Sequence, residues 1–407
     1  MIVKQYIKQF EQLGLGMFVH FGIYSLLGKG EWALHQKLIS GEAYEALAQN
    51  FSPDPNWARE LVSVAKSAGC KYITLTTRHH DGYSLFDTCG LSTYDAPYSC
   101  GRDLVREFVD ACRKENIIPF FYHTLIDWHH PDYPHNWEAY MDYLNESVAL
   151  LCKNYGPVGG FWFDGYWEHR DKDWQEDRLY GMIRSHQPEA MIINNTGISD
   201  AGALGHLELD SVTFERTNPR PINQKGAPKY IASEMCEVFN DHWGYAKADL
   251  HYKSPASLIE TLAYCRKHHA NLLINVGPLG SGLLRTIDRG YMEIIGRWVT
   301  LNDEAIRCPS PSGIPVAGNP KDFLLRDGDN YYLFCHDIPM LTNEHVGQAS
   351  AEMIPDRFEL APPVKEAYWI DNGAPVVFSQ KDGQVCVTPA FTEYGRSLVI
   401  RVAKLIC

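Results

Sequence analysis

The sequence predicts an α/β chain, with a (β/α)8-like barrel followed by a small antiparallel β-sandwich. Over the first 305 residues, helical stripes alternate with short apolar runs, as in chains whose parallel strands are joined by helices. Several of these runs are continuously apolar, which indicates strands covered on both faces. After residue 305 the helical period disappears. We therefore expect a barrel domain over residues 1–305 and a β-sandwich domain over residues 306–407.

Three helix-then-strand units define the first half of the predicted barrel. Residues 56–68 place Trp57, Leu61 and Val64 on one helical stripe, and the strand candidate CKYITLTT follows. The same order recurs at residues 103–115 before IIPFFY, and at residues 136–154 before GGFWF. Five further runs bring the number of strand candidates to eight: residues 16–21, 191–194, 211–215, 229–235 and 271–276.

The second half of the barrel is expected to be less regular. The spacers at residues 197–209 and 216–228 are short and rich in Gly, Pro and Asn, so we expect missing or degenerate helices there. An open doubly wound sheet is the structural alternative. No glycine-rich phosphate loop follows any of the strand candidates, which favours the barrel.

The C-terminal region looks like an antiparallel β domain. The Pro/Ser/Gly-rich stretch CPSPSGIP separates it from the barrel, and strand-like runs follow at residues 322–337, 367–387 and 397–403. Asp327-Gly328 inside the first run is a hairpin signal.

Charge and composition exclude several classes of function. A formal net charge of −13 argues against a surface for nucleic acid or anionic membranes. No apolar run reaches membrane-spanning length, and the N-terminal residues lack the apolar core of a signal peptide. The eleven cysteines have no CxxC spacing and are interpreted as reduced thiols of a cytoplasmic protein. Association into a homo-oligomer stays open.

Polar side chains gather where the predicted strands end. In a barrel of parallel strands these positions converge on the C-terminal face, where active sites are built. The residues are His20, His79, His80, Asp81, Tyr122, His123, Asp164, Glu215, Arg216 and Glu234.

Two chemistries compete for this cluster. A metal-dependent hydrolase needs several ligands around one ion, but neighbours on a regular strand face opposite ways, so His79 and His80 would not share an ion there. A glycosidase needs two carboxylates, partners for hydroxyl groups and an apolar wall. Asp164 with Glu234 or Glu215, beside the histidines and aromatic residues, fits this requirement better. We expect no metal and no organic cofactor.

The motifs carry a specific resemblance as well. GLGMFVHFGIYSLLGKGEW, TTRHHDGYSLFDT, GGFWFDGYW, SEMCEVFNDHWGY and NLLINVGPLGSG occur in one order between residues 14 and 306. This pattern resembles the retaining α-L-fucosidases of glycoside hydrolase family 29. The resemblance implies a barrel with a C-terminal β-sandwich, and an exo-acting enzyme that removes terminal α-linked L-fucose from oligosaccharides or glycoconjugate fragments. A catalytically silent fucose-binding protein is the alternative within the same resemblance.

The resemblance also implies roles for individual residues. Asp164 is expected to be the nucleophile, and Glu234 is the first choice for the acid/base, with Glu215 and Glu237 in reserve. The chain departs from the family at Ala33 and Ser233, near the pocket rim, which bears on the leaving group more than on the chemistry. The expected fucose-binding residues are His20, Glu31, Trp32, His79, His80, Tyr122, Trp162 and Arg216, with Phe18, Trp162 or Trp243 against the 6-methyl group.

Overall fold

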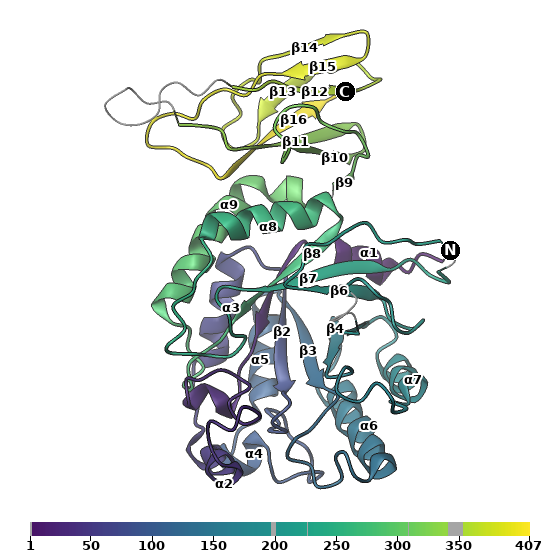
Figure 1. Cartoon of the computed structure of the whole chain (residues 1–407), viewed down its shortest axis with the longest axis vertical. Coiled ribbons are helices and arrows are strands. Elements are labelled where there is room, and N and C mark those ends of the chain that lie inside the picture. The colour runs from purple at the N-terminus through teal and green to yellow at the C-terminus, as the bar shows by residue number, and fades with distance from the viewer. Residues whose placement is uncertain (1, 197–200, 226, 308, 341–352) are drawn as a thin grey trace. The chain divides into compact units, whose positions relative to one another are not determined.

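Eight parallel strands close into a barrel in the order of the sequence (Figure 1). The computed structural model describes residues 2–196, 201–225, 227–307, 309–340 and 353–407. The last strand pairs with the first, with Val276 opposite Val19, so the barrel has no open edge. The predicted barrel is confirmed. Its strands are β1 (Leu15–Val19), β2 (Tyr72–Arg78), β3 (Ile118–Thr124), β4 (Gly160–Asp164), β5 (Met191–Asn194), β6 (Ser211–Glu215), β7 (Ala232–Val238) and β8 (Ala270–Val276).

One strand lies three residues later than predicted. The sequence placed the seventh strand at residues 229–235, whereas β7 begins at Ala232. The preceding backbone is bonded elsewhere, because Tyr230 N donates to Ile2 O and Ile231 N donates to the side chain of Gln224. Glu234 is therefore the third residue of β7 and lies well inside the barrel rather than at its rim.

The three helices predicted for the first half of the barrel are confirmed. Among the residues described between β5 and β6 and between β6 and β7, the structure has no helix, as predicted; residues 197–200 of the first spacer lie outside the described part. The helices on the outside of the strands are α3 (Trp57–Ser67), α5 (Leu104–Lys114), α6 (Trp137–Asn154) and α7 (Glu176–His186) (Figure 1). Shorter helical segments are α1 (Gln5–Glu11), α2 (Gly41–Glu45), α4 (Ala96–Cys100) and the 3-10 turns Ile23–Leu26 and Ala46–Asn50.

The barrel interior is filled by every second residue of its strands. Ile7 and Phe10 of α1 join the interior cluster at the N-terminal end, where Phe10 packs 5.6 Å from the ring of Tyr72. Towards the C-terminal end the interior residues become polar: β4, for example, follows Trp162 of the apolar cluster with Asp164. The period of two thus decides which side chain of each strand reaches the barrel mouth.

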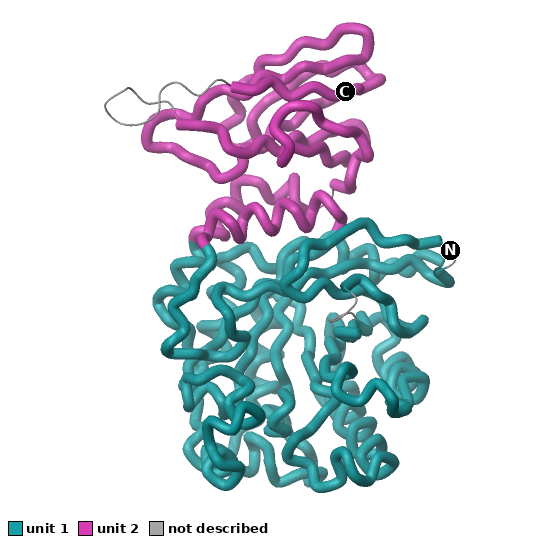
Figure 2. Tube along the Cα trace, viewed as in Figure 1, with its two compact units in different colours: residues 1–253, 270–293 teal, residues 254–269, 294–407 magenta. Residues whose placement is uncertain are grey.

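The chain divides into two compact units (Figure 2). The first comprises residues 1–253 and 270–293, and the second comprises residues 254–269 and 294–407. The second unit thus takes in α8 (Pro255–Lys267) and the later part of α9 (Thr286–Arg307), whose Trp298 Nε1 donates to Ile400 O at 2.9 Å. The boundary at residue 305, drawn from the change in sequence texture, stays a prediction.

Antiparallel sheets follow in the second unit, as predicted. One sheet has the order β13-β16-β11-β10-β9 and the other β12-β15-β14, and side chains of both share one apolar core. No described helix is both long and apolar enough to cross a membrane. The strands are β9 (Ser310–Pro311), β10 (Phe323–Asp327), β11 (Asn330–His336), β12 (Asp356–Glu359), β13 (Glu366–Trp369), β14 (Phe378–Lys381), β15 (Gln384–Val387) and β16 (Ile400–Ile406).

Replacing Gly16 with alanine tests the packing of the barrel interior. A Cβ at Gly16 would lie 2.3 Å from Cζ of Tyr72, a fully buried ring whose hydroxyl is bonded to Glu234. We expect Gly16→Ala to cost about 1–3 kcal/mol through overpacking and to lower the midpoint of chemical denaturation. The matched control is Gly181→Ala in α7, where a Cβ meets open space and should stabilise by about 0.5–1 kcal/mol. An unchanged midpoint for Gly16→Ala would contradict the packing described.

Candidate active site

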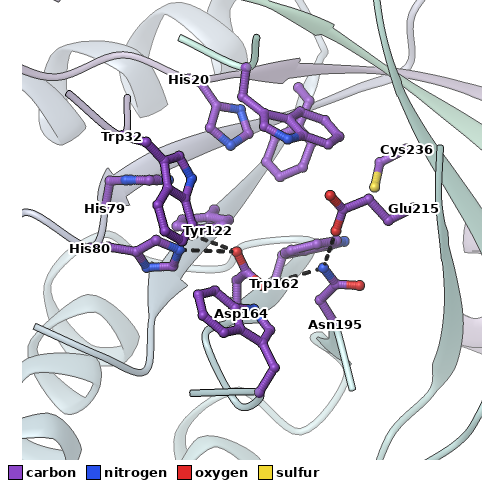
Figure 3. A pocket seen from close by; sticks show the side chains of 13 residues that line it. His20, Trp32, His79, His80, Tyr122, Trp162, Asp164, Asn195, Glu215 and Cys236 are labelled. Carbon is purple, nitrogen blue, oxygen red and sulfur yellow. Dashed lines mark hydrogen bonds and ion pairs between the residues drawn. The ribbon is translucent and has the colours of Figure 1, made fainter. Parts of the chain in front are cut away.

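A pocket opens at the C-terminal ends of the barrel strands (Figure 3). Ten of the residues predicted from the sequence line it: Phe18, His20, Trp32, His79, His80, Tyr122, Trp162, Asp164, Glu215 and Trp243. Three residues that the sequence analysis did not single out line it as well: Trp167, Asn195 and Cys236.

Asp164 is the most heavily bonded carboxylate in the pocket. Tyr122 donates its hydroxyl to Oδ2 at 3.1 Å, Asn195 donates to Oδ1 at 3.3 Å, and His80 Nε2 lies 3.4 Å from Oδ2 (Figure 3). Burial alone would raise the pKa of Asp164, but the bond and charge of His80 and the bonds from Asn195 and Tyr122 together hold this pKa below its usual value. Asp164 is therefore an ionised carboxylate with donors on both oxygens.

Glu215 lies close to Asp164 because the two share one amide. Asn195 Nδ2 is 3.3 Å from Asp164 Oδ1 and 2.6 Å from Glu215 Oε2, so these two oxygens are at most about 5.9 Å apart, the sum of the two distances. Thr213 donates to the amide oxygen of Asn195 at 3.0 Å, which turns the NH2 group towards the carboxylates. Burial and then the charge of Asp164 raise the pKa of Glu215 to about 7. Near neutral pH the pair can hold one ionised and one protonated carboxyl.

The histidines differ in what they can offer a ligand. Asn275 donates its amide to Trp243 O at 2.7 Å, so its oxygen accepts from His20 Nδ1 at 2.7 Å and leaves His20 Nε2 as an acceptor. Burial lowers the pKa of His20 to about 3 and lowers the pKa of His79 well below its usual value. Nδ1 of His79 is buried and has no partner among the described residues. Both rings are therefore neutral groups suited to bonding hydroxyls.

His79 and His80 both line the pocket, although they are neighbours in the chain. Strand β2 ends at Arg78 after an irregularity in its pairing, so neither histidine is on a regular strand, and the alternation expected of a strand does not separate them. Their ring centroids lie 4.2 Å apart. His80 Nδ1 is also bonded to Thr124 Oγ1 at 2.7 Å. Asp81 turns away from the pocket and accepts from Tyr44 at 2.7 Å.

Aromatic rings form the walls of the pocket. The ring of Phe18 lies 5.1 Å from Trp162 and 5.9 Å from Trp243, and Trp162 stacks on Tyr122 at 5.7 Å with an interplanar angle of 19°. Trp32 faces Trp167 at 5.7 Å with an angle of 23°. Such surfaces suit the CH face of a sugar and a methyl substituent.

Four of the predicted catalytic and fucose-binding residues lie outside the pocket lining: Glu31, Arg216, Glu237 and Glu234. Glu31 is buried and accepts from Gly244 N at 2.7 Å, while Arg216 bonds to Asp241 through its guanidinium at 3.3 and 3.5 Å. Arg216 directly follows Glu215, and its backbone turns with φ of 48°. Glu237 accepts from Val238 N and pairs with Lys253 at 3.2 Å.

Glu234, the first choice for the acid/base, is placed below the pocket. It pairs with Thr213 in the barrel register, whereas Glu215 pairs with Cys236 two residues further along. Glu234 is thus about 6–7 Å deeper along the strand direction than the level of Glu215. Tyr72 and Trp162 donate to its two oxygens, and Cys236 lines the pocket above it.

Of the three lining residues that the sequence analysis did not single out, only Asn195 carried a signal in the sequence. Asn195 directly follows the fifth strand, a position of the kind that drew attention to Asp164 and Glu215. Cys236 became visible only with the correct bounds of β7. Trp167 comes from the loop after β4, and no periodicity marks it.

The site does not resemble a metal centre. Over the described residues, the group of His, Cys, Asp and Glu side chains close enough to hold an ion together is Asp322, Cys335 and Asp356, in the second unit. At the barrel mouth, Asp164 is instead bonded to amide, phenol and imidazole donors. Among the described residues, the barrel mouth thus lacks a group of this kind.

The chain is similar to known alpha-L-fucosidases over most of its length. The family model for alpha-L-fucosidase matches residues 2–304. Tissue alpha-L-fucosidase of Bos taurus is 27% identical over 335 residues, which cover 74% of this chain and 69% of that protein. Among solved structures, alpha-L-fucosidase isoenzyme 1 from Paenibacillus thiaminolyticus is 27% identical with a TM-score of 0.80, covering 99% of this chain and 98% of that one.

A structure from Bacteroides thetaiotaomicron shares the fold. It is a GH29 alpha-L-fucosidase described as a trapped covalent intermediate in complex with 2-fluoro-fucosyl fluoride, 20% identical with a TM-score of 0.83, covering 99% of this chain and 96% of that one. Because the family model matches residues 2–304, well over half of the sequence, the chain belongs to the alpha-L-fucosidase family.

Proposed function

We propose that this chain is a retaining, exo-acting α-L-fucosidase that hydrolyses terminal α-linked L-fucose from oligosaccharides or glycoconjugate fragments. The observation that carries the proposal is the pair of carboxyls Asp164 and Glu215, which share the amide of Asn195 and whose facing oxygens, Oδ1 and Oε2, lie at most about 5.9 Å apart. Retaining glycosidases keep their carboxyls about 5–5.5 Å apart and inverting ones about 6.5–9.5 Å apart. The trapped covalent intermediate of the Bacteroides relative supports the same mechanism.

Asp164 acts as the nucleophile in this mechanism. Its ionised oxygen attacks the anomeric carbon, the bond to the leaving oxygen breaks, and a fucosyl ester forms on Asp164. Water then attacks the same carbon and releases fucose with its original configuration. The donors Tyr122, Asn195 and His80 keep Asp164 ionised before the first step.

Glu215 acts as the acid and then as the base. Its raised pKa of about 7 leaves a proton for the departing oxygen, and the resulting carboxylate takes a proton from the incoming water. Once Asp164 is esterified, its charge no longer raises the pKa of Glu215, so Glu215 is a carboxylate when a base is needed. Glu234 and Glu237 fit less well because neither lines the pocket and both accept other bonds.

The pocket supplies the partners of the sugar. His20 and His79, both neutral, bond hydroxyl groups, while Phe18, Trp162 and Trp243 provide the apolar surface for the 6-methyl group. The cytoplasmic location and the state of association stay predictions.

Asp164→Ala tests the nucleophile. We expect turnover of an aryl α-L-fucoside to fall by several orders of magnitude because no other ionised carboxylate is positioned to form the ester. The variant should keep the circular dichroism spectrum of the wild type and still bind fucose. Turnover near the wild-type rate would contradict the assignment, and fucose binding without turnover by the wild type would indicate a binding protein.

Glu215→Gln tests the acid/base through pH dependence. The protonated form of Glu215 is active, so kcat/KM of the wild type should fall as pH rises through about 7, the pKa of Glu215. On the acid side, activity should persist to low pH because the pKa of Asp164 lies below its usual value. The rate of Glu215→Gln on substrates with poor leaving groups should be about 10²–10⁴-fold lower than that of the wild type. Its kcat/KM should no longer fall as the pH rises above neutral.

The matched control for this experiment is Glu237→Gln. It changes a glutamate that pairs with Lys253 outside the pocket and should leave the pH profile unaltered. Azide should restore activity to Glu215→Ala by attacking the fucosyl ester in place of the activated water. If kcat/KM of Glu215→Gln still fell above neutral pH, the acid/base would be another group.

A further inference from the structure

Glu234 is a buried carboxyl beneath the pocket that the proposed mechanism does not use. It is 1% exposed. Both of its oxygens are occupied, since the Tyr72 hydroxyl donates to Oε2 and Trp162 Nε1 donates to Oε1 at 2.9 Å. Burial raises its pKa to about 7, and the two donors act in the opposite direction. A buried ionisable group is costly at such a place unless it fixes something else.

What Glu234 fixes is the indole of Trp162. A buried indole N–H requires an acceptor, and the carboxylate provides a charge-assisted one in the barrel interior. Tyr72 in turn holds the carboxylate from the opposite oxygen. The ring of Tyr72 is confined by Phe10 at 5.6 Å and Phe120 at 5.1 Å, in the space left by Gly16. The packing around Tyr72 therefore fixes the position of the Glu234 carboxyl.

Trp162 links Glu234 to Asp164, the proposed nucleophile, through a series of contacts. Its ring lines the pocket and stacks on Tyr122 at 5.7 Å with an angle of 19°, while Phe18 packs against it edge-on at 5.1 Å. Tyr122 donates its hydroxyl to Asp164 Oδ2 at 3.1 Å, and Figure 3 shows the three side chains of Trp162, Tyr122 and Asp164 together. A rotation of the indole would displace the Tyr122 ring and lengthen its bond to Asp164.

We propose that Glu234 is a positioning residue that orients Trp162 and, through the stacked ring of Tyr122, the hydroxyl that donates to Asp164. The inference rests on the proposed function because Asp164 is taken as the nucleophile. It gives the glutamate of the SEMCEV motif a role in holding the pocket floor, distinct from proton transfer to the leaving group.

A double-mutant cycle tests the route through Trp162. Glu234→Gln, Trp162→Phe and the double variant are compared with the wild type for kcat and KM on an aryl α-L-fucoside. Glu234→Gln should reduce kcat/KM about tenfold in the wild-type background, the scale of one charge-assisted hydrogen bond. In the Trp162→Phe background, which lacks the indole N–H, the same change should cost less than about twofold. An equal loss in both backgrounds would overturn the proposal.

Leaving-group dependence separates positioning from acid/base catalysis. The loss in Glu234→Gln should be the same for aryl fucosides with good and poor leaving groups, and azide should not restore activity, in contrast to the Glu215 variants. Glu237→Gln on the same strand is the matched control and should behave as wild type. Azide rescue of Glu234→Ala, or a loss confined to poor leaving groups, would make Glu234 the acid/base and overturn the positioning role.

Indole fluorescence gives a readout that does not require turnover. Glu234→Gln should shift the emission or quenching of the protein, and this difference should vanish when Trp162 is phenylalanine. An identical spectral change in both backgrounds would contradict the contact even if the wild type proved inactive on every α-L-fucoside. Inactivity of the wild type would instead count against the proposed function. Denaturation midpoints of all variants verify that they are folded.

Discussion

The side-chain amide of Asn195 positions the two carboxyls of the pocket relative to each other. Asn195 donates to Asp164 at 3.3 Å and to Glu215 at 2.6 Å, and Thr213 fixes the direction of the amide from its other side. Two carboxyls this close together repel when both are ionised, so one of them keeps a proton near neutral pH. The additional donors at Asp164 decide which one is ionised, and the proposed division of roles between nucleophile and acid rests on that asymmetry.

The barrel makes this arrangement possible through its period of two. Trp162 and Asp164 lie on the same face of β4, as Thr213 and Glu215 do on β6, so Asp164 and Glu215 are one level nearer the barrel mouth than Trp162 and Thr213. The same rule places Glu234 one level below Cys236 on β7. Glu234 is buried at the lower level, whereas Glu215 at the upper level is partly exposed and lines the pocket.

Much of the fold follows from the sequence because helical stripes and apolar runs alternate regularly. Strands β5 and β6 have the bounds that the sequence predicts, and the shortage of helices near them was visible in the Gly-, Pro- and Asn-rich spacers. The start of β7 was not predictable from its apolar pattern, because Tyr230 and Ile231 bond to Ile2 and Gln224, partners distant from the strand ladder. Because of this error of three residues, Glu234 was predicted to lie at the rim of the barrel, and Cys236 was not recognised as a residue that lines the pocket.

Residue type and strand end together predicted part of the candidate site, such as His20, Asp164 and Glu215, and the family motifs predicted aromatic members such as Trp32. Other placements depend on three-dimensional contacts. Arg216 follows Glu215 in the chain, but it turns to Asp241. Trp167 joins the wall from a loop, where it faces Trp32.

In the proposed mechanism Asp164 forms a covalent bond to the sugar. Peptide mass mapping after incubation with 2-fluoro-fucosyl fluoride would detect this bond, in a Glu215→Gln background that slows the breakdown of the ester. We expect a single 2-fluoro-fucosyl adduct on the peptide that contains Asp164. An adduct on another carboxylate, or an inverted product formed without any adduct, would contradict it.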